Sequence, residues 1–201
     1  QGTLSLEGYN EVAVKVTITD QADTNKYNLT PAGTIYYLSK QTGKINIMKA
    51  NLDGTDAKVA VEGTGNENDR ETVLLASRDW RFMALYAKRK PNDKNAQLYL
   101  LDSKTDTLKL IDEGDVGMTL GGWSEHNFIY YISRNNKQLW EDKRQALKNY
   151  NANTDSLAVS DETFGAGTNY NNTVAEQFGN PYILGNKVVY AKSLTNNTGS
   201  D

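Results

Sequence analysis

Apolar residues along this chain gather in short runs that are separated by polar turns. Uninterrupted runs such as Val73-Leu-Leu-Ala76 and Leu98-Tyr-Leu-Leu101 suit strands that are covered on both faces. Val12 to Thr19 alternates in part and is rich in β-branched residues, which also favours a strand. The pattern therefore predicts an all-β protein. Lys137 to Tyr150 also has helical spacing, but the internal repeat predicts a strand at 146–151.

Three hairpin-like stretches recur about 50 residues apart, the spacing typical of repeat architectures. Each consists of a strand, a turn with a Thr-Asp pair, and a second strand. The pairs are Thr55-Asp56, Thr105-Asp106 and Thr154-Asp155. An apolar run containing tyrosine precedes each hairpin, and a fourth copy of that run occurs near the end of the chain. The aligned tyrosines are Tyr37, Tyr86, Tyr131 and Tyr190.

A further short apolar strand, ending in a polar turn, precedes these runs at 72–81, at 119–127 and, more faintly, at 180–186. The repeating unit therefore has four strands over roughly 45–50 residues, the period of a β-propeller blade. We expect blades at about 26–65, 71–114 and 117–162, and the start of a further blade at 180–192. Residues 1–25 are predicted as N-terminal strands or a linker to an upstream domain. Residues 163–173 are predicted as a long loop and 193–201 as a polar tail.

The turn after the first strand of the third predicted blade carries a family resemblance. Gly121-Gly-Trp-Ser-Glu-His-Asn127, with the turn Leu52-Asp53-Gly54, resembles the TolB-type β-propeller repeat and is similar to the propeller of prolyl-oligopeptidase-like enzymes. The family pattern is Trp-Ser-Pro-Asp-Gly. Trp123 and Ser124 match it here, and Ser77 and Asp79 match it in the preceding copy, whereas the Pro and Gly are not matched.

The resemblance implies a bacterial protein of the cell envelope or surface, and hence an extracytoplasmic location. Rings of this family have more than four blades, so the resemblance favours an incomplete, excised propeller. The alternative is a closed four-bladed ring, in which the N-terminal strands, Thr3 to Glu7 and Val12 to Thr19, complete the last blade.

Composition excludes several classes of function. A net charge of -3 is too small to indicate a nucleic-acid partner. The absence of cysteine excludes disulfides and thiolate-bound metal. A single histidine, His126, excludes a multi-histidine metal site within this chain. No apolar run approaches the ~18 residues of a membrane span, so no membrane insertion is predicted.

Two local patterns suggest chemistry, and each has a simpler explanation. Gly122-Trp-Ser-Glu-His126 resembles a nucleophile elbow, but histidine replaces its last glycine and a strand follows where the elbow needs a helix. Asn151 to Ser156 resembles the start of a calcium loop, but the strand that follows leaves no residues to wrap an ion. We therefore predict no catalytic residue, no metal and no cofactor.

The sequence thus predicts a non-catalytic module that binds a protein or a small ligand at a propeller face. Binding residues are expected in the turns 77–81 and 124–127 and in the loop 163–173, because loops on a rigid scaffold commonly carry binding. They are Asp79, Trp80, Glu125, His126, Phe164 and Tyr170. The alternatives are the gating propeller of a serine peptidase, a propeller hydrolase whose catalytic part is absent, and a structural spacer. For a glycosidase, Asp79 and Glu125 are the candidate carboxylates.

Overall fold

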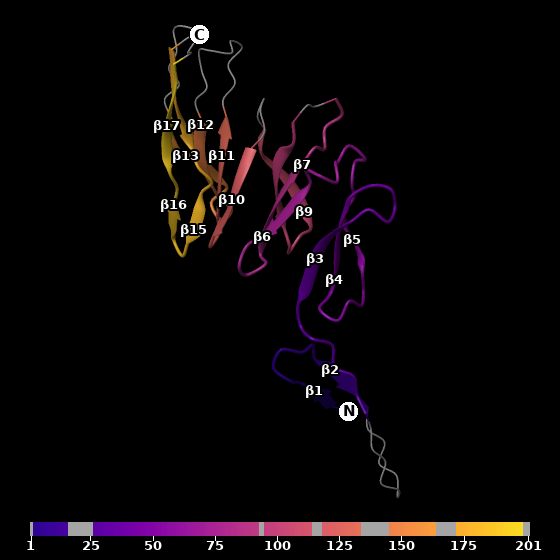
Figure 1. Cartoon of the computed structure of the whole chain (residues 1–201). Coiled ribbons are helices and arrows are strands. Elements are labelled where there is room, and N and C mark those ends of the chain that lie inside the picture. Colours follow the sequence, from indigo (N-terminus) through magenta and orange to yellow (C-terminus); the bar gives the residue numbers. More distant parts are fainter. Residues whose placement is uncertain are drawn as a thin grey trace, which may run out of the picture. The chain divides into compact units, whose positions relative to one another are not determined.

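A computed structural model describes residues 2–15, 26–92, 95–113, 118–133, 145–163 and 172–198 (Figure 1). Every regular element in these ranges is a β-strand, which confirms the all-β prediction. The region 145–151, where helical spacing competed with the repeat, forms a strand. The chain divides into two compact units, residues 1–62 and 63–201.

The first unit contains two small antiparallel sheets. In one, β1 (Gly2–Leu4) pairs with β2 (Val12–Val14). The other has the order β3 (Thr34–Ser39), β4 (Asn46–Asn51) and β5 (Lys58–Val61). Among the described residues, β1 and β2 pair only with each other. They therefore do not complete the last blade, as the closed-ring alternative required.

The second unit contains two four-stranded antiparallel sheets in which each strand pairs with the next (Figure 1). The first sheet consists of β6 (Val73–Ala76), β7 (Phe82–Ala87), β8 (Gln97–Asp102) and β9 (Thr107–Glu113). The second consists of β10 (Met118–Ser124), β11 (Asn127–Ser133), β12 (Gln145–Asn151) and β13 (Ser156–Glu162). This is the predicted blade, formed twice, and the fold is that of an incomplete, propeller-like all-β protein.

The end of the second unit is an antiparallel ribbon that consists of two successive strand pairs. Its strands are β14 (Asn172–Phe178), β15 (Tyr182–Leu184), β16 (Lys187–Val189) and β17 (Lys192–Thr198). β14 pairs with β17, and β15 pairs with β16. The segment 193–201, predicted as a polar tail, thus contains most of β17, and the predicted loop 163–173 overlaps the start of β14. Backbone groups make these pairs, so polar side chains do not prevent a strand.

Two backbone features recur in the three hairpins that carry a Thr-Asp pair. The strand register shifts between Ile47 and Met48, between Leu98 and Tyr99, and between Leu147 and Lys148. The aspartates of the turns have positive φ, 59° at Asp56, 53° at Asp106 and 53° at Asp155. Aspartate tolerates this conformation better than most residues. The same supersecondary unit therefore occurs three times, which confirms the repeat.

Strand pairing also corrects one step of the sequence alignment. Tyr86 lies opposite Leu98 and Tyr131 lies opposite Leu147, at the register shifts of their sheets. In the first unit the residue opposite Ile47 is Leu38. The structural equivalent of Tyr86 is therefore Leu38, and the alignment on Tyr37 is wrong by one residue.

The core of the second unit lies between its two four-stranded sheets. Phe128 and Tyr130, alternate residues of β11, are fully buried against β7 and β8. The intervening residue Ile129 points to the opposite face and packs with Leu147 and with Phe178 of the ribbon. Successive side chains of a strand point to opposite faces, so β11 is covered on both sides. Each fully buried aromatic or aliphatic side chain stabilises the fold by about 1.5–3 kcal/mol.

A carboxylate on the last strand of each sheet joins it to the next layer. Asp112 of β9 accepts a hydrogen bond from the hydroxyl of Tyr130 at 2.6 Å and pairs with Lys148. Asp161, the equivalent residue of β13, accepts from the hydroxyl of Tyr190 at 2.7 Å and from Nζ of Lys192 at 2.8 Å. The repeat thus places matching polar links between consecutive layers.

Candidate binding face

The turns that join the first two strands of the two four-stranded sheets meet at one end of the second unit. The β6–β7 turn spans residues 77–81, and the β10–β11 turn is Glu125 and His126. Nε2 of His126 lies 2.8 Å from Oδ2 of Asp79. Two residues predicted for binding from separate turns are therefore in direct contact. We call Asp79, Trp80, Arg81, His126 and Asn153 the turn cluster.

Asp79 is fixed within its own turn. The hydroxyl of Ser77 donates to Oδ1 of Asp79 at 2.7 Å, and the backbone N–H of Arg81 donates to the same oxygen at 3.1 Å. Ser77 is buried and also accepts from the backbone N–H of Phe82 at 3.0 Å. Hydrogen bonds from His126 and Ser77 hold the pKa of Asp79 well below its usual range. The carboxylate is therefore ionised at neutral pH.

The partners of His126 define its tautomer. Nδ1 of His126 lies 2.8 Å from Nδ2 of Asn153. An amide N–H₂ group only donates, so Nδ1 accepts, and Nε2 carries the proton that is donated to Asp79. The ring of Phe82 packs edge-on against the imidazole, with centroids 5.5 Å apart. The imidazole therefore bridges the carboxylate of one sheet and an amide of the next hairpin.

Trp80 is the exposed aromatic residue of the turn cluster. Its side chain is 48% exposed and its φ is 58°, a conformation that strains residues with a β carbon. The tight turn imposes it, because the backbone N–H of Trp80 donates to the carbonyl of Ser77 at 2.9 Å. Beside it, Arg81 stacks on Phe82, 4.4 Å from the ring centroid, and donates twice to Asp102, with Nη2 to Oδ2 at 2.7 Å.

Of the remaining predicted residues, only Glu125 lies within the described ranges. Glu125 is exposed, with a φ of 51°. Phe164 and Tyr170 lie outside the described residues. Asn153 was missed as a site residue, although the turn that holds it was singled out as a possible calcium loop. It reaches His126 because the backbone N–H of Ala152 donates to the carbonyl of His126 at 2.9 Å.

The two patterns that suggested chemistry have structural roles. Ser124 is buried in β10, and its hydroxyl donates to the carbonyl of Gly185 at 2.9 Å. A two-residue turn and a strand follow it, as expected for a hairpin and unlike a nucleophile elbow. Oδ1 of Asn151 accepts from the backbone N–H groups of Asn153 and Thr154, each at 3.0 Å. No group of three potential metal ligands occurs in the described ranges.

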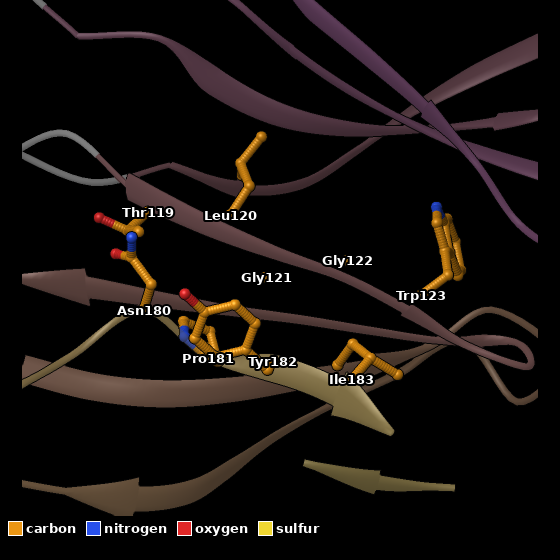
Figure 2. Close-up of a pocket in the computed structure, with 9 residues that line it drawn as sticks. All are labelled: Thr119, Leu120, Gly121, Gly122, Trp123, Asn180, Pro181, Tyr182 and Ile183. Carbon is orange, nitrogen blue, oxygen red and sulfur yellow. The ribbon is translucent and has the colours of Figure 1, made fainter. Parts of the chain in front are cut away.

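A pocket of about 480 Å³ lies between β10 and the segment 180–183 (Figure 2). Thr119 and Asn180 supply polar groups at one end of it, and Trp123 and Ile183 line the other end. Pro181 approaches Gly121 so closely that a β carbon there would lie 2.7 Å from its Cγ. The indole N–H of Trp123 donates to the carbonyl of Leu75 at 2.7 Å, which orients this residue between the sheets. This pocket, which Gly121 and Gly122 line together with the segment 180–183, was not predicted from the sequence.

Comparisons with known proteins assign no family to this chain. No family model matches the sequence, and no curated protein matches it. One similar solved structure is the crystal structure of TolB from Acinetobacter baumannii, with 12% sequence identity and a TM-score of 0.24. The match covers 71% of this chain and 48% of the TolB chain, so the chain spans about half the length of that protein. The propeller-like assignment therefore rests on the repeated four-stranded sheets.

In the parts of the chain that the structure describes, no helix is long and apolar enough to span a lipid bilayer.

Proposed function

We propose that this chain is a non-catalytic binding module that recognises a protein or a small ligand through the turn cluster. The observation that carries the proposal is Trp80, a half-exposed aromatic side chain held in a strained backbone conformation beside two fixed polar groups. Strained residues cluster at functional sites. Tryptophan is also among the residues that contribute most to binding energy.

The polar groups around Trp80 are ready to bind without rearrangement. Asp79 and His126 hold each other, and Arg81 is held by Phe82 and Asp102. Because these contacts already restrict the side chains, binding a ligand causes little further loss of side-chain entropy. Half of the Asp79 side chain and a third of the His126 side chain still face solvent. These exposed surfaces can pair with polar groups that flank an apolar group stacked on the indole.

The hydrogen bonding of His126 favours binding over hydrolysis. An Asp–His pair acts in catalysis when the second imidazole nitrogen faces a nucleophile, usually a hydroxyl group. In this chain that nitrogen faces the amide of Asn153. The serine of the elbow-like sequence, Ser124, is buried and bonded to Gly185. These contacts give no support to a propeller hydrolase built on His126.

We also propose an extracytoplasmic location, in the envelope or on the surface of a bacterium. The support is the resemblance of the turns at Trp123 and Asp79 to TolB-type repeats. Fractionation of cells that express the natural protein tests this part independently of ligand binding, and recovery from the cytoplasm would overturn it.

The binding proposal is tested by selection followed by substitution. Random dodecapeptides displayed on phage and an array of bacterial surface glycans serve as the probes. We expect a ligand whose affinity falls about 30-fold in Trp80→Ala, the 2 kcal/mol of a binding hot spot. Tyr182→Ala, which removes an exposed aromatic side chain from β15, is the matched control and should bind normally.

Two results would overturn the binding proposal. One is the absence of any selected ligand, and the other is a ligand that binds Trp80→Ala as tightly as the wild type. The non-catalytic part has its own test with fluorogenic ester and peptide substrates. Turnover that disappears in His126→Gln would show that the chain is an enzyme.

A further inference from the structure

The pocket between β10 and the segment 180–183 combines an exposed aromatic ring with polar side chains. Tyr182 of β15 is 70% exposed, and its hydroxyl points toward the end of the pocket where Thr119 and Asn180 lie (Figure 2). Within the described part of the chain, the side chains of these three residues make no hydrogen bond with the protein. Two hydroxyls and an amide are therefore available to a ligand at this end of the pocket.

The remainder of the lining is uncharged and leaves room for a small molecule. Each described residue that lines the pocket lacks a formal charge, so an ionised ligand would lose water there without gaining an opposite charge. Gly121 and Gly122 have no side chains to fill the space, and the φ of 131° at Gly122 favours glycine. The volume of about 480 Å³ is within the range of roughly 300–1,000 Å³ of small-molecule sites. The pocket therefore suits a small neutral ligand.

The two strand edges at the pocket are poorly suited to an added peptide strand. The register of β10 shifts between Leu120 and Gly122, and such a bulge disrupts the row of backbone groups along a strand. Pro181, directly before β15, has no backbone N–H to donate. Strand addition depends on a regular row of backbone hydrogen bonds, so recognition at this pocket depends on its side chains.

We propose that this pocket binds a neutral sugar ring. The hydroxyls at the edge of a pyranose both donate and accept hydrogen bonds, as do the amide of Asn180 and the hydroxyl of Thr119. The apolar C–H face of the sugar packs on the ring of Tyr182, which has an apolar body and a polar tip. The residues described for this pocket differ from those of the turn cluster, so this proposal does not depend on the function proposed above.

The test titrates the full chain with the methyl glycosides of glucose, galactose, mannose and N-acetylglucosamine, and follows binding by saturation-transfer NMR and calorimetry. We expect saturable binding of at least one glycoside, and about tenfold weaker binding in Tyr182→Ala and in Asn180→Ala. Leu184→Ala removes a side chain of β15 that is 69% exposed and is not among the residues described for the pocket. It is the matched control and should bind as the wild type does.

Two further variants separate ring packing from hydrogen bonding. Tyr182→Phe keeps the ring, so it should weaken binding less than Tyr182→Ala does. Thr119→Val keeps the shape of the side chain and removes its hydroxyl, so it should weaken binding about threefold. Glucuronic acid, the anionic counterpart of glucose, should bind more weakly than glucose, because no described cation lines the pocket.

The outcomes distinguish this site from the turn cluster. Absence of saturable binding by all four glycosides would overturn the proposal, as would a glycoside that binds Tyr182→Ala as tightly as the wild type. Loss of sugar binding in Trp80→Ala, with binding kept in Tyr182→Ala, would place the sugar at the turn cluster instead. A phage-selected peptide whose binding requires Tyr182 and not Trp80 would show that the occupant is a peptide, which would also overturn the proposal.

Discussion

The imidazole of His126 and the carboxylate of Asp79 lie 2.8 Å apart, although 47 positions separate them in the sequence and they belong to different sheets. The contact exists because the two sheets stack through Phe82 and Phe128, which brings their first turns to the same end. This side-chain contact connects the β6–β7 turn with the β10–β11 turn.

Replacing Asp79 by asparagine should change how the free energy of unfolding depends on pH. The pKa of Asp79 is lowered in the folded chain, first by the hydrogen bond from His126. A lowered folded pKa contributes stability that is present above the unfolded value of about 3.9 and is lost as the pH falls toward the folded value. Asp79→Asn should therefore lose about 1 kcal/mol at pH 7, where the half-exposed pair is screened by water, and should show a flatter decline below pH 4.

Urea unfolding at pH 7, 4 and 3 measures this effect. Glu125→Gln, a change of an exposed acid in the neighbouring turn, is the control and should keep the wild-type pH dependence. If Asp79→Asn and the wild type lose stability in parallel below pH 4, the carboxylate does not contribute in the way described.

Two buried tyrosines should differ in the free energy of their hydrogen bonds. The hydroxyl of Tyr130 donates to Asp112, whose side chain is 11% exposed, whereas that of Tyr150 donates to Asp155, whose side chain is 56% exposed. Water can replace the lost hydroxyl at Asp155 but reaches Asp112 poorly. We expect Tyr130→Phe to lower the free energy of unfolding by about 1–3 kcal/mol and Tyr150→Phe by less than about 1 kcal/mol.

Equilibrium urea denaturation of the two variants at the same pH checks the order. Both substitutions remove one hydroxyl from a side chain that is otherwise buried, so each serves as the control for the other. Equal losses, or a larger loss in Tyr150→Phe, would show that the burial of the acceptor does not determine the difference.

The sequence predicted the repeat better than it predicted the site. The Thr-Asp pairs located three hairpins, because a turn that needs positive φ restricts its residues. The contact between Asp79 and His126 was not predicted, since it depends on how two sheets stack. Strand β17 was missed because backbone pairing determined it without an apolar pattern. The alignment at Tyr36-Tyr37 failed because two adjacent tyrosines give the sequence no means of choosing the register.

Gly121 should be the least replaceable of the glycines beside the ribbon. A β carbon at this position would lie 2.7 Å from Cγ of Pro181 and 2.9 Å from the carbonyl oxygen of Ile129. Gly121→Ala should therefore cost about 1–3 kcal/mol, the range for overpacking a close contact. At Gly179 the nearest atom to an added β carbon is Cβ of Ala191 at an ordinary 3.5 Å, so Gly179→Ala is the matched control.

Thermal unfolding followed by circular dichroism distinguishes these variants. Adding Pro181→Ala to Gly121→Ala should recover part of the loss, because it removes Cγ of the proline, but the clash with the backbone of Ile129 remains. Full recovery would show that the proline alone determines the close approach. No loss in Gly121→Ala would show that the ribbon shifts away from β10 without cost.

Substitutions of Trp80 can separate the backbone strain at this position from the contribution of its indole ring to binding. Its φ of 58° is unfavourable for a residue with a β carbon by about 1–2 kcal/mol, and glycine relieves this while gaining entropy in the unfolded chain. Trp80→Gly should therefore be more stable than Trp80→Ala by about 0.5–1 kcal/mol, as measured by urea unfolding. Both variants should lose the selected ligand equally, because both lack the exposed indole. A glycine variant no more stable than the alanine variant would show that this turn stores no strain.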